Sequence, residues 1–131
     1  MESIDTDTHY PYKPLLFGGF VLLGGLLIIN QISTVLPIYY LYNWLDTPMH
    51  FLGGFGVGLV IIGIIRNIYT RRVYENTAQF WYTVVLVLCV GILWELVEVY
   101  FKVSILFGGL FWVDTIKDLL MDTFGGILSY I

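Results

Sequence analysis

Two carboxylates, Glu95 and Glu98, stand near the end of an apolar run that extends from Phe80 to Phe101. A run of about 20 apolar residues is long enough to cross the hydrocarbon core of a bilayer. An ionisable side chain inside such a run is costly, so it indicates a functional site with a partner nearby. The chemistry of these two glutamates therefore depends on the groups that they face.

Further acids repeat along the last apolar segment, where Asp114, Asp118 and Asp122 follow one another every four residues. This spacing places all three on one face of a helix. Another segment offers His50 above a glycine-rich helix face. Several carboxylates with one imidazole suit Mg²⁺, Mn²⁺, Fe²⁺ or Zn²⁺. We expect a divalent-metal site formed by His50, Glu95, Glu98, Asp114, Asp118 and Asp122.

Some of these acids have simpler explanations. Glu98 is placed to pair with Lys102 four residues later, and Asp114 with Lys117 three residues later. Asp118 also suits the first turn of a helix, where the helix dipole favours an acid. Glu95 and Asp122 have no such local cation, so either they are protonated or a cation lies between them, and we favour the cation. The expected supporting polar residues are Asn30, Gln31, Asp46 and Lys117, with Asp46 also a candidate N-cap.

The composition defines the class of protein. Hydrophobic residues make up 58% of the 131 residues and charged residues 12%, against about 25% charged in soluble domains. Nucleic-acid binding is not expected, because the chain has no basic stripe. The pattern predicts an all-α integral membrane four-helix bundle, with membrane lipid as its surroundings and partner.

Breakers and caps divide the chain into a polar tail over residues 1–14 and a single helical domain over 15–131. The last connection, 103–112, is apolar and too short to span, so we expect an interfacial or re-entrant loop before the last helix. Glycine-rich faces favour close helix packing, within the chain or between copies of it. The predicted helices cover about 15–36, 46–69, 77–101 and 114–131.

The charged connections predict the orientation. Arg66, Arg71 and Arg72 surround the link between the second and third helices, and the first link carries no basic residue. The positive-inside rule then places the arginine link and both termini in the cytoplasm, with the protein in the cell (inner) membrane. All four helices bring polar side chains to the opposite leaflet. At about 1.5 Å per residue, Glu95 and Asp122 are expected at matching depths.

Three motifs together resemble the YjdF-like group of small bacterial inner-membrane proteins, which is distantly similar to VanZ-like proteins. They are Asp46-x3-His50-Phe51-x-Gly53-Gly54, Trp94-Glu95-Leu96-x-Glu98 and Asp114-Thr115-x2-Asp118-x3-Asp122-x2-Gly125-Gly126. The resemblance covers residues 46–131 and implies a multi-pass helical fold with these acids as its signature. It implies no particular reaction.

Three classes of function fit these observations. The first is a metal-dependent enzyme that acts on a lipid headgroup, with Glu95 and Glu98 as catalytic or ligand groups. The second is an ion, proton or metal transporter, which would need a polar route through the other leaflet. The third is a non-catalytic accessory subunit whose acids form ion pairs.

Overall fold

The computed structural model describes residues 12–36, 38–68, 76–101 and 111–131, and in these ranges it contains helices and no strand. The expected all-α fold is confirmed. Four long helices form the bundle, and two short elements follow the first of them. The elements are α1 (Tyr12–Val35), α2 (Ile38–Leu41), the 3-10 helix η1 (Asn43–Leu45), α3 (Asp46–Ile68), α4 (Asn76–Tyr100) and α5 (Phe111–Leu128).

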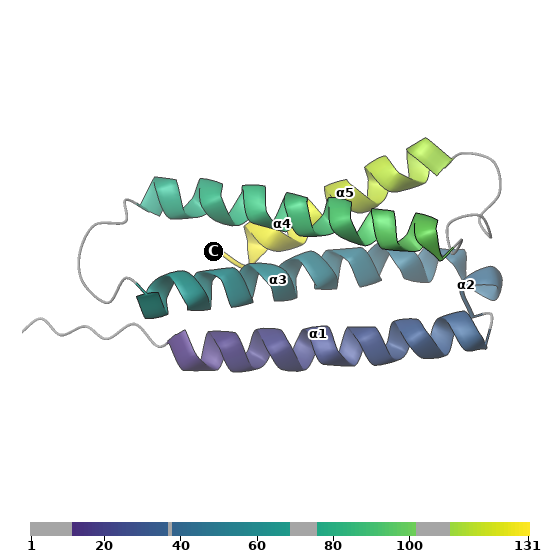
Figure 1. Cartoon of the computed structure of the whole chain (residues 1–131), viewed down its shortest axis with the longest axis horizontal. Coiled ribbons are helices and arrows are strands. Elements are labelled where there is room, and N and C mark those ends of the chain that lie inside the picture. The colour runs from purple at the N-terminus through teal and green to yellow at the C-terminus, as the bar shows by residue number, and fades with distance from the viewer. Residues whose placement is uncertain (1–11, 37, 69–75, 102–110) are drawn as a thin grey trace, which may run out of the picture.

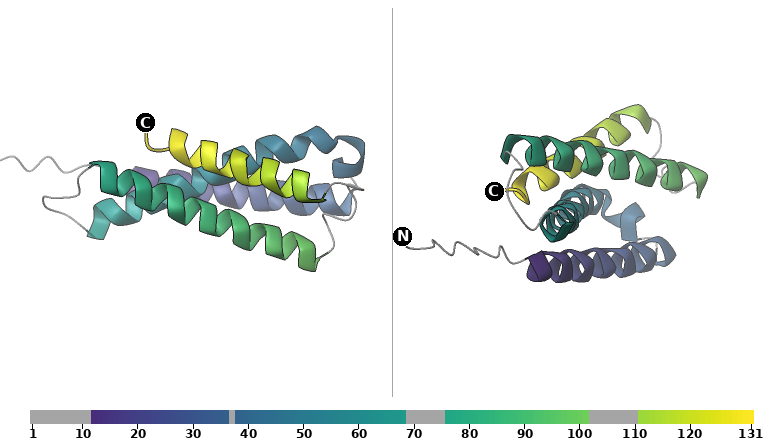
Figure 2. Two further views of the ribbon diagram at one scale, coloured as in Figure 1. Left: turned by 90° about the horizontal axis from the view of Figure 1, so that it is seen from above. Right: turned by 60° about the vertical axis from the view of Figure 1, so that its left-hand side comes forward.

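Helix α3 is the centre of the bundle, with α1 on one side and α4 and α5 on the other (Figures 1 and 2). Its buried face includes one residue every four positions, which is the spacing of a single helix face. Two of the five residues in this row are glycines, and neighbouring helices approach closely there. The residues of this row are Asp46, His50, Gly54, Gly58 and Ile62.

Helix α4 contributes a second buried row with the same spacing. This row changes from polar at its start, through Val87 and Gly91, to the carboxylate of Glu95. The rest of α4 is largely exposed and apolar, as expected for a surface that faces lipid. The sequence pattern therefore fixes which side of α4 meets the bundle. The buried row consists of Gln79, Thr83, Val87, Gly91 and Glu95.

The expected helix bounds agree with the structure to within one residue, except at the start of α1 and at both ends of α5, which stops at Leu128 rather than at residue 131. Helix α1 begins at Tyr12, inside the segment expected to be a polar tail. Helix α5 begins at Phe111, so Trp112 belongs to the helix rather than to the preceding loop. The rest of the expected tail, 1–11, and of the expected interfacial loop, 103–110, lies outside the described residues.

Three described helices are long and apolar enough to cross a membrane, namely α1, α3 and residues 77–100 of α4. The fourth expected span, α5, is not among them. It carries Asp114, Lys117, Asp118 and Asp122 within its 18 residues. Helix α5 turns back along α3 and α4, and the C-terminus lies short of their far ends (Figure 1). We infer that its polar face is tolerated because it is turned toward the other helices.

Glycines bring α3 and α5 into backbone contact. A Cβ atom added to Gly54 would overlap the carbonyl oxygen of Asp122, and one added to Gly125 would overlap that of Phe51. The two helices therefore cross at a separation that only glycine permits at these positions. This crossing holds Asp122 against α3 beside Gly54, one turn along the helix from His50.

We predict that Gly54→Ala destabilises the fold by at least about 1–3 kcal/mol, the usual cost of overpacking. The added methyl group meets backbone atoms that cannot move without separating α3 from α5. The free energy of unfolding in mixed micelles measures the effect. Gly25→Ala is the matched control, since a Cβ there meets no described atom within 4 Å. Equal stability of the two variants would contradict the observed crossing.

Candidate metal centre

The polar residues of three helices meet at the end of the bundle that carries α2. Helix α3 contributes Asp46 and His50, one turn apart on its buried face, and α4 contributes Glu95 at the end of its buried row. Helix α5 contributes Asp118 and Asp122. All five residues are at most 8% exposed. The expected convergence of the carboxylates and the imidazole is therefore observed.

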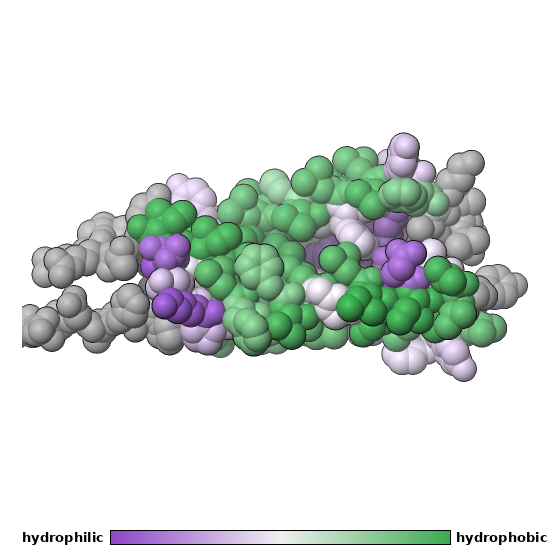
Figure 3. All heavy atoms as spheres, turned by 60° about the horizontal axis from the view of Figure 1, so that its bottom comes forward, coloured by the Kyte–Doolittle hydropathy of each residue, from purple (hydrophilic) through white to green (hydrophobic). Residues whose placement is uncertain are grey.

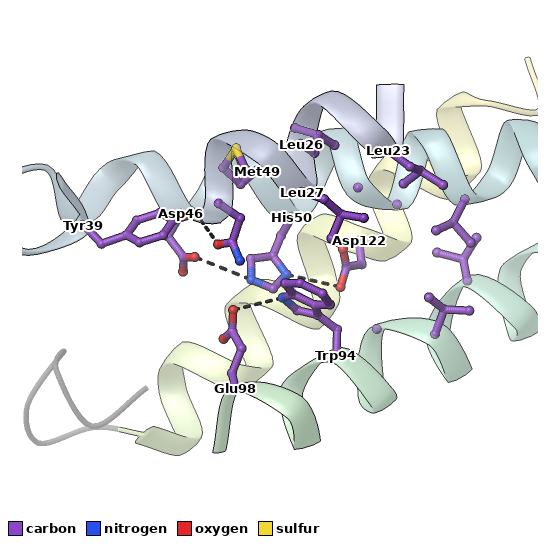
Figure 4. A pocket seen from close by; sticks show the side chains of 17 residues that line it. Leu23, Leu26, Leu27, Tyr39, Asp46, Met49, His50, Trp94, Glu98 and Asp122 are labelled. Atoms are coloured by element: carbon purple, nitrogen blue, oxygen red, sulfur yellow. Dashed lines mark hydrogen bonds and ion pairs between the residues drawn. The ribbon is translucent and has the colours of Figure 1, made fainter. Parts of the chain in front are cut away.

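His50 lies at the centre of the cluster, with a carboxylate near each ring nitrogen (Figure 4). Its Nδ1 is hydrogen-bonded to Asp122 Oδ2 at 3.3 Å. Its Nε2 lies 3.6 Å from Asp46 Oδ1 and 4.0 Å from Asp118 Oδ2. An imidazole that donates from Nδ1 to a carboxylate presents the lone pair of Nε2 on its other side, as metal-binding histidines usually do. That lone pair would point between Asp46 and Asp118.

Lys117 places one positive charge among three carboxylates at the outer side of the cluster. Its Nζ lies 2.7 Å from Asp114 Oδ1, 3.3 Å from Asp118 Oδ1 and 3.8 Å from Asp46 Oδ2. The expected pair with Asp114 is confirmed, and the contacts with the other two aspartates extend it. One oxygen of Asp118 thus faces the ammonium group, whereas the other faces His50.

The carboxylate of Glu95 is buried and forms no ion pair with a described cation, although a ring nitrogen of His50 lies within 4.8 Å of one of its oxygens. Its Oε2 accepts a hydrogen bond of 2.8 Å from Thr115 Oγ1. Its Oε1 is buried and has no hydrogen-bond partner among the described residues. Asp118 Oδ1 is likewise without a hydrogen bond there, because its 3.3 Å contact with Lys117 is an ion pair of poor hydrogen-bond geometry. Unsatisfied buried oxygens of this kind call for an explanation.

The expected depth match between Glu95 and Asp122 is wrong. Glu95 contacts Thr115 near the start of α5, whereas Asp122 faces Gly91, one turn further into α4. Four residues along a helix correspond to about 6 Å. Helix α5 begins three residues earlier than expected and crosses α4 at an angle (Figure 2). Counting residues from the helix ends therefore gave the wrong depth for Asp122. Glu95 is instead close to Asp118.

Glu98 points into a cavity and accepts a hydrogen bond of 2.9 Å from Trp94 Nε1 (Figure 4). Its expected partner, Lys102, lies outside the described residues. Two other residues that were expected to support the site lie in different surroundings. Asn30 lines the same cavity, whereas Gln31 is exposed on α1.

Tyr39 of α2 lines the cavity, and its hydroxyl donates a hydrogen bond of 2.7 Å to Asn30 Oδ1. Burial raises the pKa of Tyr39 above its usual range, and the nearby carboxylates of Asp46 and Glu98 raise it further. The hydroxyl therefore remains protonated and keeps donating to Asn30. This contact links α1 to the polar end of the bundle.

Three combinations of residues place one ligand atom each within 4.8 Å of the others: Asp46, His50 and Glu98; His50, Glu95 and Asp118; and Asp46, Asp114 and Asp118. Two ligands bound at about 2.0–2.2 Å from one metal lie at most about 4.4 Å apart. Small side-chain movements would therefore satisfy each set. The third set surrounds Lys117, which already supplies its positive charge.

The set of His50, Glu95 and Asp118 fits a metal best. All three residues are buried, and Glu95 Oε1 has neither a hydrogen bond nor an ion pair among the described residues. Asp122 belongs to none of the three sets, and its hydrogen bond to His50 Nδ1 makes it an orienting group. Thr115 occurs in the third sequence motif but was not predicted as a site residue, although its position three residues before Asp118 places it on the same helix face.

We predict that His50→Leu destabilises the protein by about 1–3 kcal/mol, because it leaves the buried carboxylate of Asp122 without its hydrogen bond. His50→Gln is the control, since its amide can still donate. Unfolding is measured in a chelator, so that a bound cation does not contribute. If His50→Leu were as stable as the wild type, the imidazole would not hold the cluster together.

The chain matched no curated protein and no solved structure. Residues 4–131 match the model of a family described as "Predicted membrane protein (DUF2238)". This match agrees with the three apolar helices that are long enough to span a bilayer. The chain belongs to this family of membrane proteins.

Proposed function

We propose that this membrane protein binds a divalent cation through His50, Glu95 and Asp118, with Asp46 and Glu98 as additional ligands. One observation carries the proposal: three buried ligand residues from three helices converge within 4.8 Å, and Glu95 Oε1 has no hydrogen-bond partner among the described residues. A buried carboxylate without a counter-charge is expensive. A cation at this place would remove that cost.

The arrangement of His50 supports the same proposal. Asp122 accepts the hydrogen bond at Nδ1 and would fix the tautomer that leaves Nε2 as a ligand. Imidazole with carboxylates suits Mn²⁺, Fe²⁺ or Zn²⁺, and Mg²⁺ would bind mainly through the oxygens. Lys117 would remain outside this centre and balance the charge of Asp114.

We further propose that the metal acts on a lipid headgroup. The site lies at the end of the apolar helices, beside η1 with its exposed Trp44, and aromatic side chains of this kind favour the membrane–water interface. Lipid headgroups lie at the same level. A divalent metal there would polarise a phosphoryl oxygen or activate water. Glu98, which lines the adjoining cavity, is placed to act as a ligand or general base.

A transport role has less support, because a route to the other leaflet would have to pass Val87. This side chain is 1% exposed, and a Cβ added to Gly126 would come within 2.8 Å of it. Among the other polar residues of that half, Thr83 bonds to its own helix and Cys89 is exposed on the outer surface. The role of a non-catalytic accessory subunit would leave the unsatisfied oxygen of Glu95 unexplained.

The sequence also supports a proposal for the location and orientation of the protein in the membrane. We propose that the protein lies in the inner membrane, with both termini and the arginine-bearing link on the cytoplasmic side. Helix α5 is not one of the three candidate spans, but it turns the chain back along α3 and α4 toward that side (Figure 1). We also propose that the protein is related to the YjdF-like group and, more distantly, to VanZ-like proteins. This relationship does not identify a reaction.

Metal analysis of purified protein tests the cation. We predict that wild type carries a divalent metal and that Glu95→Gln lowers its affinity by more than about tenfold, since even the loss of a residue that only supports a ligand costs about 10–100-fold. Glutamine keeps the acceptor for Thr115 but loses the charge. Gln79→Met, a substitution of a buried polar residue at the other end of α4, is the control and should retain the metal. Absence of metal from the wild type after reconstitution with all four cations would overturn the proposal.

The action on lipid is tested separately. Metal-loaded protein is incubated with a total polar lipid extract, and mass spectrometry follows changes in the headgroups. We predict a headgroup product that requires the metal and is lost in Glu98→Gln and Glu95→Gln. Lipids that remain unchanged with the metal-loaded wild type would argue against an enzyme and leave the metal site standing.

A further inference from the structure

A cavity of about 250 Å³ adjoins the polar cluster and extends along α1, α3 and α4. One end is apolar, with side chains such as Leu23, Leu26 and Val57. The other end reaches His50 and Glu98 (Figure 4). The cavity is therefore amphipathic along its length, with an acidic end and a hydrocarbon-like end.

The cavity is bordered by residues of the outer surface. Leu27 of α1 is 55% exposed and Val90 of α4 is 42% exposed, and both line it. Helices α1 and α4 each pack on α3, so the space between them is bounded by α3 at its back. The space-filling view shows hydrophilic side chains recessed between hydrophobic ones near the end that carries α2 (Figure 3). In a bilayer, this border would face lipid chains.

We propose that the cavity holds one acyl chain of a glycerophospholipid, with the phosphate headgroup at the end formed by His50 and Glu98. This inference rests on the proposed function, because the cation would have to bridge the lipid phosphate and the carboxylates. Among the described residues, this end of the bundle carries six acids and the single lysine Lys117, and without a cation the acids would repel an anion. The headgroup lies at the metal site and the chain follows the leucines of α1.

The size of the cavity supports a partly inserted lipid. Pockets that enclose a whole small molecule have volumes of about 300–1,000 Å³, and this cavity is smaller. The rest of the lipid would stay in the bilayer beyond Leu27 and Val90. Exposed apolar residues on both sides of the entrance give that part a hydrocarbon environment.

Gly53 allows the cavity to be filled by substitution. It lines the cavity from α3, and a Cβ added to it meets only Asp122 Oδ1, at the ordinary distance of 3.7 Å. A leucine at this position would occupy the space proposed for the chain. Gly25→Leu on α1 is the matched control, because the added Cβ there meets no described atom within 4 Å.

Trp94 reports on occupancy, since it lines the cavity and is bonded to Glu98. The other tryptophans, Trp44, Trp81 and Trp112, are exposed and are replaced with phenylalanine. This protein is reconstituted as purified in phosphatidylcholine vesicles that contain a small fraction of chain-brominated phosphatidic acid. The unsubstituted phosphate of phosphatidic acid would bind the cation more strongly than the choline-esterified phosphate of the bulk lipid, so the site should prefer the brominated lipid. We expect the fluorescence of Trp94 to be quenched more strongly than the mole fraction of brominated lipid in the bilayer would produce. Gly53→Leu should abolish this excess, and Gly25→Leu should retain it.

Metal content and unfolding are measured on the same samples. If Gly53→Leu does not fold, Val57→Phe fills the same cavity in its place. Quenching of Trp94 in proportion to the bulk lipid, in protein that holds its metal, would overturn the lipid site and leave the proposed metal function intact. Excess quenching in metal-free protein would instead overturn the metal function. A dimer that Gly53→Leu dissociates, with no excess quenching, would assign the cavity to a second copy of the chain.

Discussion

The burial of several carboxylates inside an apolar bundle is the constraint on which the rest of the structure depends. Each buried charge must find a counter-charge or hydrogen-bond donor, because neither lipid nor packed side chains can replace water. The protein meets this need in steps. Asp122 is bonded to His50, Glu95 to Thr115, and Asp118 faces Lys117. One oxygen of Glu95 remains without a hydrogen bond among the described residues, and the proposed cation accounts for it.

This compensation requires the helices to be very close. His50 reaches Asp122 only because Gly54 and Gly125 let α3 and α5 touch along their backbones. Gly91 plays the same part on α4, where a Cβ would come within 2.7 Å of the Asp122 carboxylate. Packing and electrostatics are therefore coupled: the small residues that would weaken an isolated helix are the ones that make its buried charges tolerable.

The same crossing also shapes the cavity. Helices α4 and α5 share one side of α3, which leaves α1 alone on the other and opens a space between α1 and α4 that ends at the polar cluster. An acidic site at the end of an apolar cavity suits a molecule with a polar headgroup and a hydrocarbon chain. The proposed metal and the proposed lipid thus belong to one arrangement, although they are established by different measurements.

The sequence by itself determined the class of the protein, the four long helices and the shared helix face of Asp114, Asp118 and Asp122, because apolar length and a spacing of four residues are local properties. It also determined the pair of Asp114 with Lys117. It did not determine the relative depths of Glu95 and Asp122, the hydrogen bond from Thr115 to Glu95 or the ion pair of Lys117 with Asp46. These depend on where α5 begins and how it crosses its neighbours. That crossing is decided by glycine contacts between segments far apart in the chain, so only the tertiary structure could fix it.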